Sequence, residues 1–214
     1  MRSRSVALVA VASMLASLAF AQESAEPPPV QAIWKEQRVT FYFQSFTTFY
    51  SCSSLETKIR RILIAVGASP DMRLRTRGCV SHNDVARAPY VQIELIAPVE
   101  ATPEALAERE KTRTMRELVA RVRGETKAAA EAAAQFPAQR RTVSLSRGKV
   151  YLEPGDCELV DQIKKELLPL LGVKIVEDDV RCSPHQLSMT QPKLVVEALF
   201  PMPSPDAAPD TKSP

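Results

Sequence analysis

The chain reads CSSLETKIRRILIAVG over residues 52–67 and CELVDQIKKELLPLLG over residues 157–172. Each stretch begins with a cysteine and reaches a glycine 15 residues later. Apolar residues recur between them at helical spacing, and glycine commonly follows the last residue of a helix. The two stretches therefore predict two equivalent helices. Pro169 conflicts with the second one, because a proline inside a helix removes a hydrogen bond and kinks the last turn.

A second pair of segments, residues 79–98 and 182–201, matches without a gap. Five positions are identical: Cys79/Cys182, His82/His185, Pro89/Pro192, Glu94/Glu197 and Pro98/Pro201. All four cysteines and both histidines of the chain fall at equivalent places in this repeat. Such self-similarity indicates an internal duplication.

Strand-like segments surround both predicted helices. They cover residues 39–43, 72–77 and 90–97 in the first half, and 142–145, 149–152, 173–180 and 193–200 in the second. We predict an α+β fold in which a strand-helix-strand-strand module is duplicated about a pseudo-twofold axis. Its sheet would be mainly antiparallel, with the helices on one face. One module of roughly 50 residues is marginally stable alone, which favours a shared core over two independent domains.

The predicted boundaries divide the chain into six segments. These are a signal peptide (1–21), a disordered N-terminal segment (22–36), the first module (37–98), a helical linker (99–138), the second module (139–200) and a disordered Pro-rich tail (201–214). Two arginines, an apolar run and the small-x-small triplet Ala19-Phe20-Ala21 are typical of a secretory signal. A membrane anchor is the alternative, but the run is shorter than the roughly 20 residues that span a bilayer.

Export places the protein in the periplasm or outside the cell, with no integral membrane span after cleavage. The full chain has 28 Lys+Arg and 25 Asp+Glu. Removing residues 1–21 takes away Arg2 and Arg4, which leaves 26 against 25 and a formal charge of +1. A nearly neutral protein lacks the basic surface of a nucleic-acid-binding protein, so no nucleic-acid partner is expected.

The cysteines are predicted to form one disulfide in each half. The first helix rises roughly 21 Å and the next strand returns roughly 23 Å, which brings Cys79 back beside Cys52. The same count brings Cys182 beside Cys157, and an oxidising compartment makes pairing the default. The alternative is an envelope protein that binds zinc or copper through its two Cys-x-x-His sites.

His82 and His185 each lie three residues after the cysteine that follows a strand. The ordinary interpretation is that the imidazole ring packs on the disulfide or caps a turn. The alternative is a ligand or metal contact, or a hydrolase in which a histidine works with a carboxylate such as Glu94 or Glu197. The sequence contains no recognised catalytic signature, so we expect no catalytic residue, no cofactor and no enzymatic activity.

Six of the aromatic residues lie close together: Phe41, Tyr42, Phe43, Phe46, Phe49 and Tyr50. One interpretation is that they fill the core where the chain enters the first helix. The other is an exposed groove, in which Phe46, Phe49 and Tyr50 contact a peptide, a glycan or an apolar ligand. Interleaved serine and threonine hydroxyls would suit polar contacts in such a groove.

The run Phe-Tyr-Ser-Cys at 49–52, the helix end at Gly67 and Cys-Ser-Pro-His at 182–185 resemble a group of uncharacterised secreted or periplasmic bacterial proteins. The resemblance covers most of residues 39–200 and implies export, but no known activity. Together with the absence of a catalytic signature, it leads us to expect a non-enzymatic binding or interaction protein. The expected partner is an envelope protein, a peptide or a glycan.

Overall fold

The structure is a computed structural model that describes residues 27–79, 85, 88–124, 134–146, 150, 152–183 and 185–203. The predicted signal peptide, His82 and nearly all of the predicted tail lie outside these residues. Six strands are described: β1 (Val30–Tyr42), β2 (Arg73–Arg77), β3 (Tyr90–Glu100), β4 (Phe136–Ser144), β5 (Lys174–Asp179) and β6 (Lys193–Pro201). The helices are α1 (Cys52–Ala65), α2 (Pro103–Lys111), α3 (Arg113–Arg123) and α5 (Cys157–Glu166), with the 3-10 helices η1 (Pro154–Asp156) and η2 (Leu168–Leu171).

The strands form one antiparallel sheet in the order β2-β3-β1-β4-β6-β5, so the predicted α+β class is confirmed. Each half contributes three neighbouring strands, and β1 meets β4 at the middle. The order is the same from either edge if β4, β5 and β6 correspond to β1, β2 and β3. A duplicated module would have this order, although the duplication and the twofold axis themselves stay predictions.

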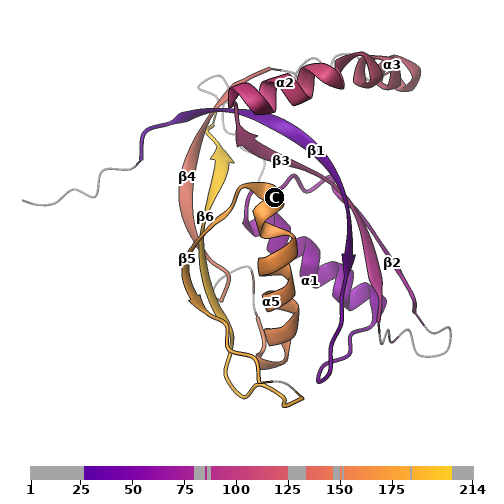
Figure 1. Ribbon diagram of the computed structural model, residues 1–214, viewed down its shortest axis with the longest axis vertical. Helices are drawn as coiled ribbons and strands as arrows, with labels where there is room; N and C mark the ends of the chain where they lie inside the picture. Colours follow the sequence, from indigo (N-terminus) through magenta and orange to yellow (C-terminus); the bar gives the residue numbers. More distant parts are fainter. Residues whose placement is uncertain are drawn as a thin grey trace, which may run out of the picture.

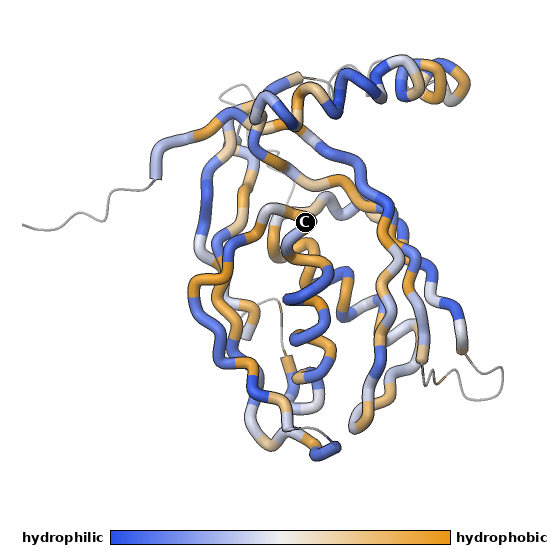
Figure 2. The backbone as a smooth tube through the Cα atoms, viewed as in Figure 1, coloured by the Kyte–Doolittle hydropathy of each residue, from blue (hydrophilic) through white to orange (hydrophobic). Residues whose placement is uncertain are grey.

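Helices α1 and α5 lie inside the curve of the sheet (Figure 1). Helices α2 and α3 lie apart from them, beside the N-terminal half of β1. Leu55 and Ile59 of α1 and Leu159 and Ile163 of α5 belong to one continuous buried cluster, which includes strand residues of both halves. Hydrophobic positions run along the strands and the two inner helices (Figure 2). The two halves therefore share one core.

A glycine with a left-handed backbone closes the helical segment of each half. Gly67 follows α1 with φ 94°, and Gly172 follows η2 with φ 63°. The conflict with Pro169 is resolved because α5 stops at Glu166 and the chain continues as the 3-10 helix η2. Proline is accepted there because the first residues of a helix need no backbone N–H partner.

The predicted disordered segment 22–36 is wrong from Val30 onward, since residues 30–36 belong to β1. Val30 to Ala32 pair with β4, residues from Ala32 onward pair with β3, and Trp34 packs on Phe136 with 5.0 Å between the ring centroids. Proline-rich sequence before Val30 suggested disorder, but the strand is stabilised by partners that lie far away in the sequence.

The predicted helical linker 99–138 also needs correction. Its first residues complete β3, its last residues begin β4, and its helical part is divided at Thr112 into α2 and α3. Thr112 has φ −98° and ψ 0°, and its N–H donates to the Arg109 carbonyl as in a 3-10 turn. The predicted tail, 201–214, begins one residue too early, because Pro201 is the last residue of β6.

The two edge strands of the described sheet differ in burial. In β2, Leu74 is buried whereas Arg73, Arg75 and Arg77 are exposed, so this strand has one buried and one exposed face. Every residue of β5 is exposed, including Ile175 and Val176. Within the described part of the chain, no helix combines the length and the apolar character needed to cross a bilayer.

Candidate functional site

The structure has two disulfides, Cys52–Cys79 and Cys157–Cys182, which are the pairs that the helix and strand lengths predicted. Their Cα atoms lie 6.3 Å and 5.6 Å apart. Each disulfide joins the first residue of an inner helix to the segment that follows the next strand. The disulfides therefore fix the first residue of each inner helix beside the residue that each disulfide joins to it, Cys79 or Cys182.

The polar and aromatic segment 44–50, called loop 44–50 below, is held by the first turn of α5. A single carboxylate oxygen of Glu158, Oε2, accepts from the Ser45 hydroxyl, from the Thr47 hydroxyl at 3.1 Å and from the Phe46 N–H at 3.1 Å. The Thr47 N–H adds a longer bond of 3.3 Å. A charged acceptor strengthens such hydrogen bonds, so Glu158 anchors this loop of the first half to the second half.

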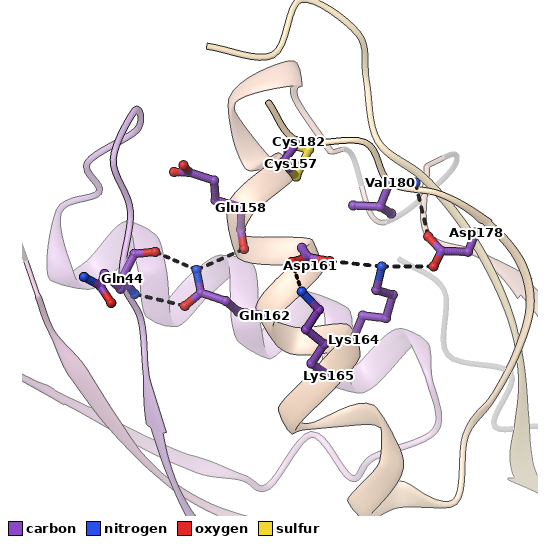
Figure 3. Close-up of polar contacts among 10 residues, drawn as sticks. All are labelled: Gln44, Cys157, Glu158, Asp161, Gln162, Lys164, Lys165, Asp178, Val180 and Cys182. Carbon is purple, nitrogen blue, oxygen red and sulfur yellow. Dashed lines mark hydrogen bonds and ion pairs between the residues drawn. A yellow bond between two sulfur atoms is a disulfide. The ribbon is translucent and has the colours of Figure 1, made fainter. Parts of the chain in front are cut away.

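Gln162 extends the same anchor by one helical turn (Figure 3). Its side-chain oxygen accepts from the Gln44 N–H at 2.9 Å, and its side-chain nitrogen donates to the Gln44 carbonyl at 2.6 Å. Residues four apart lie on one face of a helix, which is why Glu158 and Gln162 reach neighbouring parts of the loop. The backbone of loop 44–50 is thus hydrogen-bonded to α5 at two places, through Glu158 and through Gln162.

Beneath the loop lies a buried polar cluster formed by both halves. Asp156 is 1% exposed; it accepts from the Tyr50 hydroxyl at 2.6 Å, from Lys58 Nζ at 2.9 Å and from the Glu153 N–H at 2.8 Å. Lys58 also pairs with the Glu153 carboxylate at 2.8 Å. A buried carboxylate is tolerated only when it is paired and hydrogen-bonded in this way.

The electrostatic environment keeps both donors protonated. Burial, and then the hydrogen bond to Asp156, raises the pKa of Tyr50 far above its ordinary range. Desolvation acts against the charge of Lys58, but its hydrogen bonds to Asp156 and Glu153 outweigh this and raise its pKa. Tyr50 and Lys58 therefore act as stable hydrogen-bond donors to the Asp156 carboxylate.

A second set of ion pairs ties α5 to the edge strand β5 (Figure 3). Lys164 Nζ lies 3.0 Å from Asp161 and 2.9 Å from Asp178. Although desolvation opposes it, pairing with Lys165 and Lys164 lowers the pKa of Asp161. These pairs fix the position of α5 and thereby of its Glu158.

Two of the three predicted aromatic contacts are exposed on this anchored loop. The Phe46 side chain is 56% exposed and Phe49 is 49% exposed. The imidazole of His185 packs edge-on against the Phe46 ring with 4.7 Å between the centroids. His185 has φ 59°, an uncommon conformation for a residue other than glycine, and it follows the second disulfide by three residues. Phe46, Phe49 and His185 define the aromatic surface of the candidate site.

Tyr50 does not belong to this surface, which corrects its assignment as a ligand contact. It is 7% exposed because its hydroxyl is used inside the protein by Asp156 and its ring packs against Phe43. Three of the hydroxyls expected to serve a ligand are occupied: Ser45 and Thr47 bind Glu158, and Ser51 caps α1 through the Ser54 N–H. The fourth, on Thr48, is buried and has no hydrogen-bond partner among the described residues. The aromatic run is therefore divided between core and surface.

The histidine–carboxylate pair proposed for a hydrolase does not form in the second half. Glu197 lies 3.4 Å from Arg140 and 3.9 Å from Lys174, while His185 contacts Phe46. The other histidine, His82, lies outside the described residues. All four cysteine sulfurs are used in disulfides, so none is a thiolate in this oxidised form. The described residues contain no group of three or more His, Cys, Asp or Glu arranged to hold a metal.

Sequence reasoning missed Glu158, Gln162 and Asp156, which connect the two halves. The only signal was their place in the first turns of a predicted helix, where acidic residues are ordinary. Their partners in the first half lie between 98 and 118 residues away, as for Lys58 with Asp156 and Gln44 with Gln162. Such contacts have no local pattern that a single sequence reveals.

The chain matches no protein-family model, and a comparison with curated proteins and with solved structures finds no similar protein.

Proposed function

We propose that this protein is a non-enzymatic binding protein that acts outside the cytoplasm, and that its partner contacts Phe46 and Phe49. The partner is an envelope protein, a peptide or a glycan. The observation that carries the proposal is the exposure of both phenylalanines on a loop that Glu158 and Gln162 hold from beneath. Exposed large apolar side chains on a well-bonded loop are more typical of recognition than of folding.

The anchoring matters because binding costs free energy when it orders a mobile loop. Loop 44–50 is bonded through its backbone at Gln44, Phe46 and Thr47, so this cost is reduced before a partner arrives. Aromatic side chains also contribute much of the free energy of typical interfaces. His185 adds a polar edge to the Phe46 ring, which suits a partner that combines apolar and hydrogen-bonding groups.

Action outside the cytoplasm is supported by the two disulfides, because thiols in the cytoplasm are normally kept reduced. The apolar sequence at residues 6–20 after two arginines agrees with export. Neither the metal-binding nor the hydrolase alternative has a comparable observation in its favour. The first requires cysteines that are here bonded to each other, and the second requires a histidine–carboxylate contact that His185 does not make with Glu197.

The test places a photo-crosslinking residue at position 46 or 49 of the exported protein in living cells. Position 115 is the matched control, because Met115 is a still more exposed apolar residue on α3, far from loop 44–50. We expect one specific partner from positions 46 and 49 and none from position 115. The purified protein is examined in parallel on glycan and peptide arrays.

The proposal also predicts the effect of truncation. Phe46→Ala combined with Phe49→Ala should weaken binding of the crosslinked partner by about tenfold or more, with no loss of stability, because both side chains are exposed. The proposal is wrong if positions 46 and 49 give no product, or if position 115 gives the same one.

A further inference from the structure

A cavity of about 190 Å³ lies between β1 and the helical pair α2–α3. Loop 44–50 follows the opposite end of β1, so this cavity is separate from the aromatic surface (Figure 1). Its lining residues are Ile33, Trp34, Lys35, Glu36, Ala105, Glu108, Arg109, Thr112 and Arg116. Drug-sized ligands occupy pockets of roughly 300 Å³ or more, so only a small ligand would fit here.

Two guanidinium groups line this cavity without a carboxylate partner among the described residues. Arg116 donates through Nη2 to the Arg109 carbonyl at 2.7 Å, and its buried Nε has no hydrogen-bond partner within the described part of the chain. Arg109 forms no ion pair there either. Burial, and then the nearby charge of Arg116, lowers the pKa of Arg109. Two like charges therefore face a partly enclosed space.

The acidic residues of the lining do not neutralise this pair. Glu108 is taken by Lys35, with 2.8 Å between Nζ and Oε2. Glu36 is exposed and forms no ion pair among the described residues. Glu110 and Glu117 pair with Arg113, and the charge of Glu110 offsets only part of what lowers the pKa of Arg109. An unpartnered buried donor beside incompletely compensated positive charge is costly unless an anion occupies the space.

We propose that this cavity binds a small oxyanion, which Arg109 and Arg116 hold between them. Guanidinium groups match the planar geometry of carboxylate and phosphate oxygens and bind them with paired hydrogen bonds. Ile33 and Trp34 form an apolar wall, while the Thr112 hydroxyl donates to the Arg109 carbonyl at 3.1 Å and is not counted as a donor to the anion. A phosphate group and a small carboxylate share this chemistry, and the experiment distinguishes them.

The chain reports on this site by itself, because Trp34 is its only tryptophan. The exported, disulfide-bonded protein is titrated with sodium phosphate and, separately, with sodium acetate, while sodium chloride keeps the ionic strength constant. We expect a saturable change in Trp34 fluorescence with at least one of them. Saturation with phosphate alone assigns a phosphate ligand, and saturation with acetate alone assigns a carboxylate.

Variants identify the residues. Arg116→Gln and Arg109→Gln should each weaken the interaction by about tenfold or more, whereas Arg113→Gln, on the exposed side of α3, should leave it unchanged. These variants should stay folded because α2 and α3 supply no member of the main core. Far-UV circular dichroism verifies this. The absence of saturation with either anion, or an equal loss in Arg113→Gln, overturns the proposal.

Discussion

At the scale of single residues, Asp156 shows how the two halves are joined by charge as well as by apolar packing. It is almost fully buried, and its partners Tyr50 and Lys58 come from the first half of the chain. Removing one partner of a buried ion pair leaves the other charge without compensation. The stability of the junction therefore depends on the complete set of contacts.

We expect Asp156→Ala to lower the free energy of unfolding by about 3 kcal/mol or more, because it leaves Lys58 and Tyr50 without their acceptor. Chemical denaturation measures this change. Asp179→Ala is the matched control, since Asp179 pairs with Arg181 on the exposed strand β5 and should change stability by less than about 1 kcal/mol. Equal effects of the two variants would contradict this account of the cluster.

The same cluster predicts a loss of stability in alkaline solution. The folded pKa values of Tyr50 and Lys58 are raised above the ordinary values of 10.0 and 10.5. Above those values the unfolded chain releases protons that the native state retains, so their stabilisation is complete at lower pH and is lost as the pH rises. Tyr50→Phe should be less stable near neutral pH.

In the Tyr50→Phe variant, the free energy of unfolding should fall less steeply with rising pH, by about 1.4 kcal/mol per pH unit. The reason is that residue 50 then has no proton that the unfolded chain releases and the folded protein retains. Denaturant unfolding from about pH 8 to about pH 12 measures both slopes. Identical slopes for the two proteins would show that Tyr50 loses its proton equally easily when folded and unfolded.

At the scale of secondary-structure elements, the ends of the two inner helices are equivalent in sequence but not in packing. A Cβ atom added at Gly67 would lie 2.4 Å from the Leu199 carbonyl oxygen of β6, whereas one at Gly172 would have nothing within 4 Å. Both glycines have positive φ, so both substitutions strain the backbone. Only the end of α1 is also pressed against the opposite half.

Gly172→Ala should therefore lower the free energy of unfolding by about 1 kcal/mol, because alanine is strained in the left-handed conformation. Gly67→Ala should cost at least about twice as much, because the helix end must move away from β6. Thermal unfolding of the two variants gives the comparison, and each serves as the control for the other. Equal destabilisation would mean that α1 and β6 separate easily.

The elements that the sequence predicted correctly are those with a strong local pattern. Helical spacing with a terminal glycine located α1 and α5, and the strand-like segment 72–77 located β2. Residues 30–36 and the break at Thr112 were missed because long-range pairing and one backbone turn decide them. In the candidate site, the exposed Phe46 and Phe49 were among the predicted contacts, but the burial of Tyr50 depends on Asp156, 106 residues away.

At the scale of the whole molecule, one core and one sheet include both halves. Such a molecule should unfold in a single cooperative step, even though each half carries its own disulfide. Trp34 reports on the first half, near the seam where β1 meets β4. Far-UV circular dichroism reports on helices and strands of both.

Replacing the second disulfide tests this cooperativity. Cys157→Ala combined with Cys182→Ala opens a loop with a sequence separation of 25 and should cost about 3.5 kcal/mol. We expect the Trp34 fluorescence transition to shift by the same amount as the circular dichroism transition, although Trp34 lies in the other half. A Trp34 transition that stays in place would show that the halves unfold independently.

The arginine row of β2 has a consequence for the behaviour of many copies in solution. A strand at the edge of a sheet offers unpaired backbone groups to other chains, and natural proteins commonly protect such edges with charge. If two copies met antiparallel through β2, Arg73, Arg75 and Arg77 of one would face the same residues of the other. Electrostatic repulsion between the arginines therefore disfavours aggregation of copies through this edge. Salt screens these charges and weakens the repulsion.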